Sequence, residues 1–247
     1  MINACKGCLS LEIKGLYWQK VEAYLNSENE YFDKVTASTN NFQKELFEEM
    51  KSRIKEDDTS VPYFRNNYFY ITRFEKGSQY PIYSRKKESL EVDEEILFDV
   101  NEEAQEHEYF QLGALNVSPD NKLVAFATDT VSRRQYTIQI KNLETGELYS
   151  DKILNTTGSA VWANDNSTLF YSMKDEVTLR SHKILKHSLF TDSKDDDVVF
   201  HEKDETYNTF VYKSKSKKYI IIGSSSTLTS EYRILNANTP NAQFKIF

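Results

Sequence analysis

The stretch ALNVSPDNKLVAFATD, residues 114–129, contains two short apolar runs with a polar turn between them. Pro119 fixes its own φ angle, and Asp120 and Asn121 beside it favour a tight turn. The run Leu123–Ala127 is short, apolar and bounded by polar residues, which is typical of a buried strand. The stretch therefore predicts a strand, a turn and a second strand.

The same pattern recurs along the chain. The segment AVWANDNSTLFYS (160–172) places Asp165 at the turn, 45 residues after Asp120. A weaker copy, FVYKSKSKKYIIIGSS (210–225), has a Lys/Ser-rich turn followed by an apolar strand at Tyr219–Ile222. Repeats of this length are typical of four-stranded propeller blades. The sequence predicts a mainly β fold with about three blades.

The segment before the repeats has a different period. Residues 17 to about 55 carry apolar residues at helical spacing, with a break at 36–41. Asn40 is a candidate N-cap of the second helix, with Gln43 three residues later. The second helix carries an apolar stripe of Phe42, Leu46, Met50 and Ile54. Two N-terminal helices are therefore expected, and their apolar faces need a partner surface.

Strand patterns begin at Tyr63. YFYITRF (68–74) and YPIYSRK (80–86) flank a glycine-containing loop, as in a hairpin, and EILFDV (95–100) gives a third strand. We therefore expect a helical segment over residues 1–60 and the N-terminal half of a β-propeller over 61–247.

The composition argues against several classes of function. The chain has 247 residues, 39% hydrophobic and 28% charged, with a net charge of −7. An acidic chain is a poor match for nucleic acid or an anionic membrane, and no apolar run reaches the roughly 18 residues that span a bilayer. Residues 1–15 lack the apolar core of a secretory signal. We expect a cytoplasmic protein with neither nucleic acid nor membrane as partner.

The sequence lacks the motifs that are typical of catalytic, nucleotide-binding and metal-binding sites. No two of the seven glycines are fewer than eight residues apart, so the sequence contains neither G-x-S-x-G nor G-x-G-x-x-G. Cys5 and Cys8 form one C-x-x-C without a second ligand pair, which favours two incidental thiols over zinc. The histidines show no metal-binding spacing and are expected at the surface: His107, His182, His187 and His201. We predict no catalytic, cofactor-binding or metal-binding residue and no cofactor.

Two acidic runs have alternative interpretations. Residues 91–108 contain nine acids and no Lys or Arg, which favours a solvated loop over a surface that attracts cationic substrates. DSKDDD (192–197) lacks the glycine and glutamate of an EF-hand loop, so a polar loop is favoured over a calcium site.

Several segments resemble a known family in order along the chain. They are VEAYLNSENEYFDKV (21–35), LFEEMKSRIKEDDTSVPY (46–63), YFYITRFEKGSQYPIYSRK (68–86) and LGALNVSPDNKLVAFATDT (112–130). They resemble the N-terminal part of the oligopeptidase B-like members of the prolyl oligopeptidase family of serine peptidases. NLETGEL (142–148) and the repeat at Ala160 extend the resemblance, which covers about residues 18–247.

The resemblance implies the fold and the function of a larger protein. In that family a seven-bladed propeller covers an α/β-hydrolase domain that holds a Ser-Asp-His triad, and the N-terminal helices belong to the hydrolase side. It implies a lid that admits short peptides, and cleavage after Lys or Arg. The triad motifs of the family are not found in this sequence. We therefore expect the isolated chain to be inactive and its partner to be a C-terminal hydrolase domain.

Two other interpretations remain. The chain is a free-standing propeller-like module that binds peptides or proteins, or it is a truncated gene product without function. A binding module has no need of the helices at 17–55. The fragment interpretation also predicts uncovered apolar faces at Leu123–Phe126, at Tyr219–Ile222 and along the helical stripe.

Overall fold

The structure is a computed structural model, and it describes residues 18–247. Cys5 and Cys8 lie outside the described residues. The chain divides into a helical unit that ends at Glu56 and a β unit, Asp57–Phe247. Within the described part, no helix is long and apolar enough to cross a membrane.

The helical unit contains the two predicted helices. They are α1 (Trp18–Thr36) and α2 (Asn40–Ser52), joined by a 3-10 turn, η2 (Ala37–Thr39). The prediction that Asn40 caps α2 is wrong, because Asn40 is already the first helical residue and Thr39 occupies the cap. Thr39 makes no capping bond to the backbone, and its hydroxyl oxygen instead accepts a hydrogen bond from Gln43 Nε2 at 2.8 Å.

The apolar stripe of α2 is not buried within the helical unit. Neither α1 nor α2 contains a buried residue. The exposed fraction is 63% for Phe42 and 61% for Met50. Ile54, the last residue of the predicted stripe, lies beyond the end of α2 at Ser52 and is 67% exposed. Taken by itself, the helical unit therefore leaves the stripe uncovered, as expected.

The β unit contains sixteen strands and two short helical turns. The strands of the first half are β1 (Asp58–Thr59), β2 (Tyr63–Arg65), β3 (Tyr68–Phe74), β4 (Ile82–Lys87), β5 (Glu95–Asp99), β6 (Gln111–Val117), β7 (Leu123–Asp129) and β8 (Tyr136–Asn142). Those of the second half are β9 (Leu148–Trp162), β10 (Thr168–Lys174), β11 (Ser181–Ser188), β12 (Asp197–His201), β13 (Asn208–Lys213), β14 (Tyr219–Ser225), β15 (Ser230–Asn236) and β16 (Lys245–Ile246). The turns are α3 (Val100–Glu103) and η3 (Ser193–Asp195).

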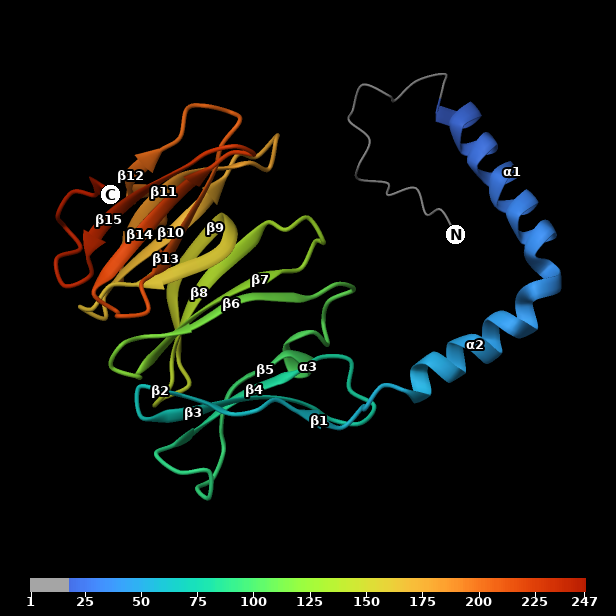
Figure 1. The fold of residues 1–247 in the computed structure, drawn as a ribbon, viewed down its shortest axis with the longest axis horizontal. Helices are drawn as coiled ribbons and strands as arrows, with labels where there is room; N and C mark the ends of the chain where they lie inside the picture. Colours follow the sequence, from blue (N-terminus) through green and yellow to red (C-terminus); the bar gives the residue numbers. More distant parts are fainter. Residues whose placement is uncertain (1–17) are drawn as a thin grey trace. The chain divides into compact units, whose positions relative to one another are not determined.

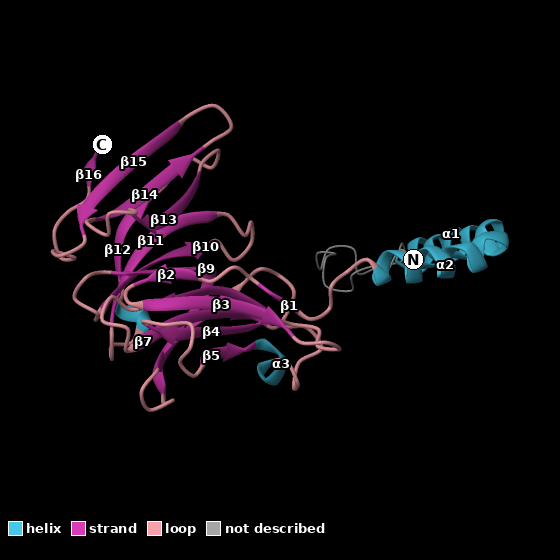
Figure 2. Cartoon of the chain, turned by 60° about the horizontal axis from the view of Figure 1, so that its bottom comes forward, coloured by secondary structure: helices cyan, strands magenta, loops and turns pink. Residues whose placement is uncertain are grey.

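These strands form a five-stranded, a seven-stranded and a four-stranded antiparallel sheet (Figures 1 and 2). The seven-stranded sheet contains two blades that share β9. Ile153 in the first half of β9 pairs with Ile138 of β8, and Trp162 in its second half pairs with Leu169 of β10. The blades are thus β2–β5, β6–β9, β9–β12 and β13–β16. The mainly β, partial-propeller fold is confirmed, and the repeat at Phe210 is a full four-stranded sheet rather than a partial one.

The turns of the repeats have a common backbone geometry. Asn121, Asn166 and Lys217 all adopt positive φ, at 67°, 60° and 62°. Asp120 Oδ1 accepts from the backbone N–H of Lys122, and Asp165 Oδ1 accepts from that of Ser167. Asn and Asp tolerate such turns because their side chains bond the nearby backbone. The strand–turn–strand pattern predicted from residues 114–129 is therefore confirmed.

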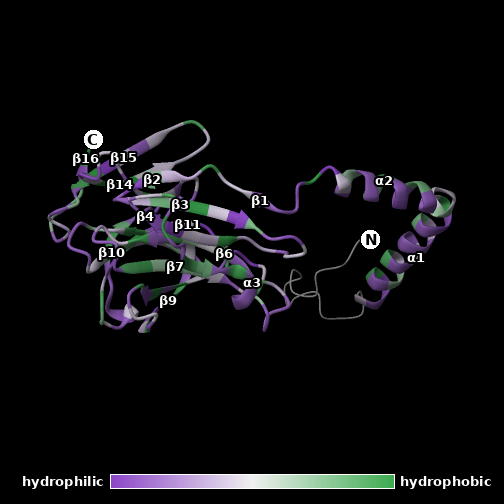
Figure 3. Ribbon diagram, turned by 90° about the horizontal axis from the view of Figure 1, so that it is seen from below, coloured by the Kyte–Doolittle hydropathy of each residue, from purple (hydrophilic) through white to green (hydrophobic). Residues whose placement is uncertain are grey.

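Packing between blades explains the apolar runs. In β10, Leu169 and Tyr171 belong to the core shared with the second blade, and Phe170 between them belongs to the core shared with the fourth. Successive residues of a strand face opposite sides, so a strand covered on both faces is continuously apolar. β7 has the same character and is drawn largely in green in Figure 3.

Two of the predicted uncovered faces differ from expectation. Leu123–Phe126 is buried, because the second blade has a neighbour on each side. In β14, Ile220 and Ile222 are fully buried, whereas Tyr219 is 42% exposed. Only the outward face of this blade is uncovered.

Candidate functional site

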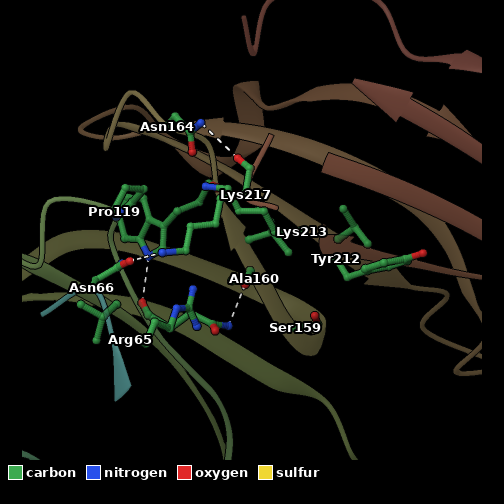
Figure 4. A pocket seen from close by; sticks show the side chains of 14 residues that line it. Arg65, Asn66, Pro119, Ser159, Ala160, Asn164, Tyr212, Lys213 and Lys217 are labelled. Carbon is green, nitrogen blue, oxygen red and sulfur yellow. Dashed lines mark hydrogen bonds between the residues drawn. The ribbon is translucent and has the colours of Figure 1, made fainter. Parts of the chain in front are cut away.

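The first strand of every blade contributes to one shared hollow in the β unit, with a volume of about 330 Å³ (Figure 4). These first strands are β2, β6, the second half of β9, and β13. The residues that line the hollow are Arg65, Asn66, Asn116, Val117, Pro119, Ser159, Ala160, Val161, Trp162, Asn164, Val211, Tyr212, Lys213 and Lys217.

The hollow lies at one end of the blades. Asn66, Pro119, Asn164 and Lys217 each belong to the turn between the first and second strands of a blade. The turns of all four blades therefore meet at this end, and the repeated turn geometry places their side chains around one space.

Side chains connect neighbouring first strands. Trp162 is 3% exposed, and its indole N–H donates to the carbonyl oxygen of Asn116 at 2.8 Å. The amide nitrogen of Asn116 donates to the carbonyl oxygen of Ala160, also at 2.8 Å. These two hydrogen bonds join β6 to the second half of β9. They therefore hold the second and third blades together beside the hollow.

The hollow is basic. Arg65, Lys213 and Lys217 line it, and none of the described residues that line it is Asp or Glu. Lys213 Nζ donates to the carbonyl oxygen of Trp162 at 2.9 Å. Burial and the nearby positive charges of Arg65 and Lys217 lower the pKa of Lys213 to about 8, against a smaller opposing effect of Asp165.

Residues of the first and third blades hydrogen-bond to Lys217 in the turn of the fourth blade. Lys217 Nζ donates to the side-chain oxygen of Asn66 in the first blade (Figure 4). Asn164 of the third blade donates to the carbonyl oxygen of Lys217 at 3.2 Å and to Asn238 at 2.7 Å. Chemically, the hollow offers cationic and amide donors, so it is suited to binding an anion or carbonyl oxygens.

One predicted surface histidine is buried. His187 of β11 has no exposed side-chain surface, so the surface prediction is wrong for this residue. Its Nε2 lies 3.0 Å from Asp151 Oδ1 and its Nδ1 lies 2.8 Å from Asp196 Oδ1. Burial alone lowers the pKa of His187, but the two carboxylates outweigh it and raise the pKa. Both ring nitrogens are occupied, so this histidine is not available as a base.

The carboxylates of this cluster are held by further donors. The backbone N–H of Phe190 donates to Asp151 at 2.6 Å, and the Tyr171 hydroxyl donates to Asp196 at 2.8 Å. Asp151 lies in the half of β9 that completes the second blade, whereas the other members belong to the third blade. The cluster therefore ties two blades together. The burial of His187 could have been predicted from the sequence, because His187 is two residues after the core residue Leu185 and so faces the same side of β11.

The acidic runs are more structured than plain loops. Within 91–108, Glu95 forms two 2.8 Å bonds with the buried Arg85, Glu94 pairs with Arg73, and Asp99 caps α3. Within 192–197, the side chain of Asp196 is 2% exposed. In the described residues, no group of three or more His, Cys, Asp and Glu side chains is arranged to hold a metal ion.

The sequence of this chain matches the model of a known protein family. The family model for the prolyl oligopeptidase N-terminal beta-propeller domain matches residues 17–247. The chain belongs to the prolyl oligopeptidase family. The match covers both helices and all four blades, over nearly the same residues as the resemblance.

Named relatives in this family are peptidases. Dipeptidyl aminopeptidase BI of Pseudoxanthomonas mexicana is 40% identical over 88% of this chain, and Protease 2 of Moraxella lacunata is 33% identical over 91%. The matches span 32% and 34% of these relatives, so the chain spans about a third of their length.

Solved structures agree with the fold. Oligopeptidase B from Leishmania major superposes with a TM-score of 0.83 at 32% identity, covering 92% of this chain and 32% of that one. Oligopeptidase B from Trypanosoma brucei with covalently bound antipain gives a TM-score of 0.81 at 27% identity. It covers the same shares of the two chains.

Proposed function

We propose that this chain is the N-terminal propeller portion of an oligopeptidase B-like serine peptidase, in which it covers an α/β-hydrolase domain and admits short peptides. The observation that carries the proposal is the family match across residues 17–247. The first strands of four blades around one hollow support it, because a ring of such strands surrounds a central passage.

The exposed face of α2 supports a hydrolase domain as partner. Phe42, Phe47 and Met50 are each more than half exposed, and an apolar helix surface of this kind is stabilised when another surface buries it. A hydrolase domain on this stripe corresponds to the arrangement that the resemblance implies.

The substrate class follows from the relatives and from the hollow together. The names of the relatives, dipeptidyl aminopeptidase and protease, support peptide hydrolysis. Cleavage after Lys or Arg requires an acidic pocket for the substrate side chain. The described lining of the hollow contains no acid, so we assign that pocket to the hydrolase domain. We further propose a cytoplasmic location.

A chimera tests the proposal. Residues 17–247 would replace the matching segment of dipeptidyl aminopeptidase BI, and hydrolysis of fluorogenic peptides ending in Arg, Lys or Ala would be measured. We expect the chimera to cleave short peptides and to spare folded proteins, while the 247-residue chain alone is inactive and is not labelled by a serine phosphonylating reagent. A chimera whose serine is labelled but which cleaves no peptide would contradict the proposal. Stoichiometric labelling of the chain alone would contradict it as well.

A binding module without chemistry is the second candidate. The cationic hollow favours it, since Arg65, Lys213 and Lys217 need no hydrolase domain to bind an anionic group. Peptide binding by a chain that does not support activity in the chimera would favour this candidate.

A further inference from the structure

We propose that the hollow is a carboxylate-binding site for peptides, with Arg65, Lys213 and Lys217 as the cationic ligands. The inference rests on the proposed function, because it names the chemical group by which a peptide is held at the turn end of the propeller. Nothing in the chemistry of peptide hydrolysis itself requires such a site.

The first support is the local excess of positive charge. The whole chain has a net charge of −7, yet the described lining contains three cations and no acid. Asp165 is the acid that acts on Lys213. Asp165 is engaged in its own turn, where it accepts from the backbone N–H groups of Ser167 and Thr168 at 3.1 Å and 3.0 Å. The Thr168 hydroxyl also donates to it at 2.6 Å. The cations therefore lack a carboxylate ligand of their own.

The second support is unused donor capacity. An ammonium group has three donors and a guanidinium has five. Lys213 Nζ donates to one protein acceptor, the carbonyl oxygen of Trp162, and Lys217 Nζ donates to one, the Asn66 side chain. Within the described part of the chain, the Arg65 guanidinium has no hydrogen-bond acceptor and no ion-pair partner. Donors from the first and fourth blades thus face one space.

The third support is the cost of leaving these charges together. Lys213 is half-buried, and its pKa is lowered to about 8 by burial and by its cationic neighbours. A carboxylate among the three cations would oppose this lowering, since an opposite charge within a few ångströms favours the charged amine. The site is therefore arranged so that an anion relieves existing repulsion.

The size of the hollow favours a peptide end over a small ion. A volume of about 330 Å³ is within the range of ligand sites and exceeds the space that a small inorganic anion needs. The remaining wall offers the indole of Trp162, which suits the apolar part of a peptide residue. Either the terminal carboxylate or an acidic side chain supplies the same charged group.

The test uses the chain with Trp18→Phe, which leaves Trp162 as the sole tryptophan. Its fluorescence would be followed at low salt during titration with N-acetyl-trialanine and with the C-terminal amide of the same peptide. We expect the free carboxylate to bind at least about tenfold more tightly than the amide. An N-acetyl peptide amide with one internal Glu distinguishes the acidic side chain from the terminal carboxylate.

Matched variants locate the site. Arg65→Gln and Lys213→Gln should each weaken carboxylate binding about tenfold, and Lys213→Arg should retain most of it. Lys215→Gln is the control, because this substitution removes one positive charge two residues from Lys213, at a position that does not line the hollow. Equal affinity for carboxylate and amide, or an equal effect of the control, would overturn the inference. Tighter binding of inorganic phosphate than of any peptide would also overturn it.

The outcome is separable from that of the proposed function. Direct binding needs no hydrolysis, so an active chimera without carboxylate preference leaves the peptidase function standing and removes this site. If a variant of the isolated chain fails to fold, the same substitution in the chimera gives the answer through KM. Lys213→Gln should raise KM for carboxylate-bearing peptides about tenfold more than it raises KM for the matching amides.

Discussion

Lys217 and Asn66 are 151 residues apart in sequence, and the Nζ atom of one donates a hydrogen bond to the side-chain oxygen of the other. The bond joins the first-to-second-strand turn of the fourth blade to that of the first. Asn66 adopts a φ of 49° and Lys217 a φ of 62°, so both residues lie in turns that Asn and Gly favour. A lysine occupies such a position here, and its side chain reaches across the hollow.

Removing the Lys217 charge should raise the pKa of Lys213. Lys217 is one of the positive charges that lower this pKa to about 8, so Lys217→Met favours the charged form of Lys213 and moves its pKa upward. The pH dependence of reductive methylation of Lys213, read by mass spectrometry, measures the shift. Lys215→Met should leave the value unchanged, and a downward shift in Lys217→Met would refute the electrostatic account.

His187→Asn should destabilise the β unit by about 3–5 kcal/mol, because it leaves Asp151 and Asp196 buried without their shared cation. Urea unfolding followed by circular dichroism measures this change. His107→Asn alters an exposed histidine and should stay within about 0.5 kcal/mol of the parent. Equal effects of the two substitutions would show that the cluster does not stabilise the fold.

Stability should fall as pH rises through the raised pKa of His187. The pKa in the unfolded chain is about 6.5, and in the folded chain it is higher. The stabilisation is therefore fully present below about pH 6.5 and is lost as pH rises through the folded value, with a slope of at most about 1.4 kcal/mol per pH unit. Urea midpoints between pH 6 and 9 test this, and the component should be missing in His187→Asn.

Gly158→Ala should cost more than Gly146→Ala, although both glycines have positive φ, at 83° and 75°. An added Cβ at Gly158 would lie 2.7 Å from Tyr136 Cγ, whereas nothing lies within 4 Å at Gly146. Backbone strain of about 1 kcal/mol applies to both, and overpacking adds about 1–3 kcal/mol at Gly158. Thermal melts of the two variants measure the difference, and equal losses would contradict this assignment.

The chain should self-associate through the apolar stripe of α2. Phe42 and Met50 are more than 60% exposed, and a contiguous stripe of this kind favours association. Phe42→Gln with Met50→Gln should lower both the sedimentation coefficient and the binding of the dye ANS. Val177→Gln changes a single residue that is 90% exposed in a turn, and should leave both unchanged. A parent chain that is monomeric and does not bind the dye would refute the prediction.

Local features were predictable from sequence, and features that join distant segments were not. The turn at Pro119–Asn121 and the hairpin of β3 and β4 depend on neighbouring residues, so turn chemistry and period-2 patterns found them. His187 was missed because Asp151 belongs to another blade. The basic hollow was missed because Arg65 and Lys213 meet only when four blades assemble. The fold class itself came from the repeats and from the family resemblance.

The sharing of β9 between two blades has a consequence for hydrogen exchange. Thr156 pairs with Tyr136 of β8 and with Met173 of β10, so backbone pairing continues along β9 from the second blade into the third, with a register shift in each ladder. No such ladder joins β12 to β13 or β5 to β6 among the described strands. Amide protons of the second and third blades should therefore exchange as one cooperative unit, while those of the fourth blade open at a lower free energy. A circular permutation opened between β12 and β13 should accordingly be tolerated better than one opened within β9.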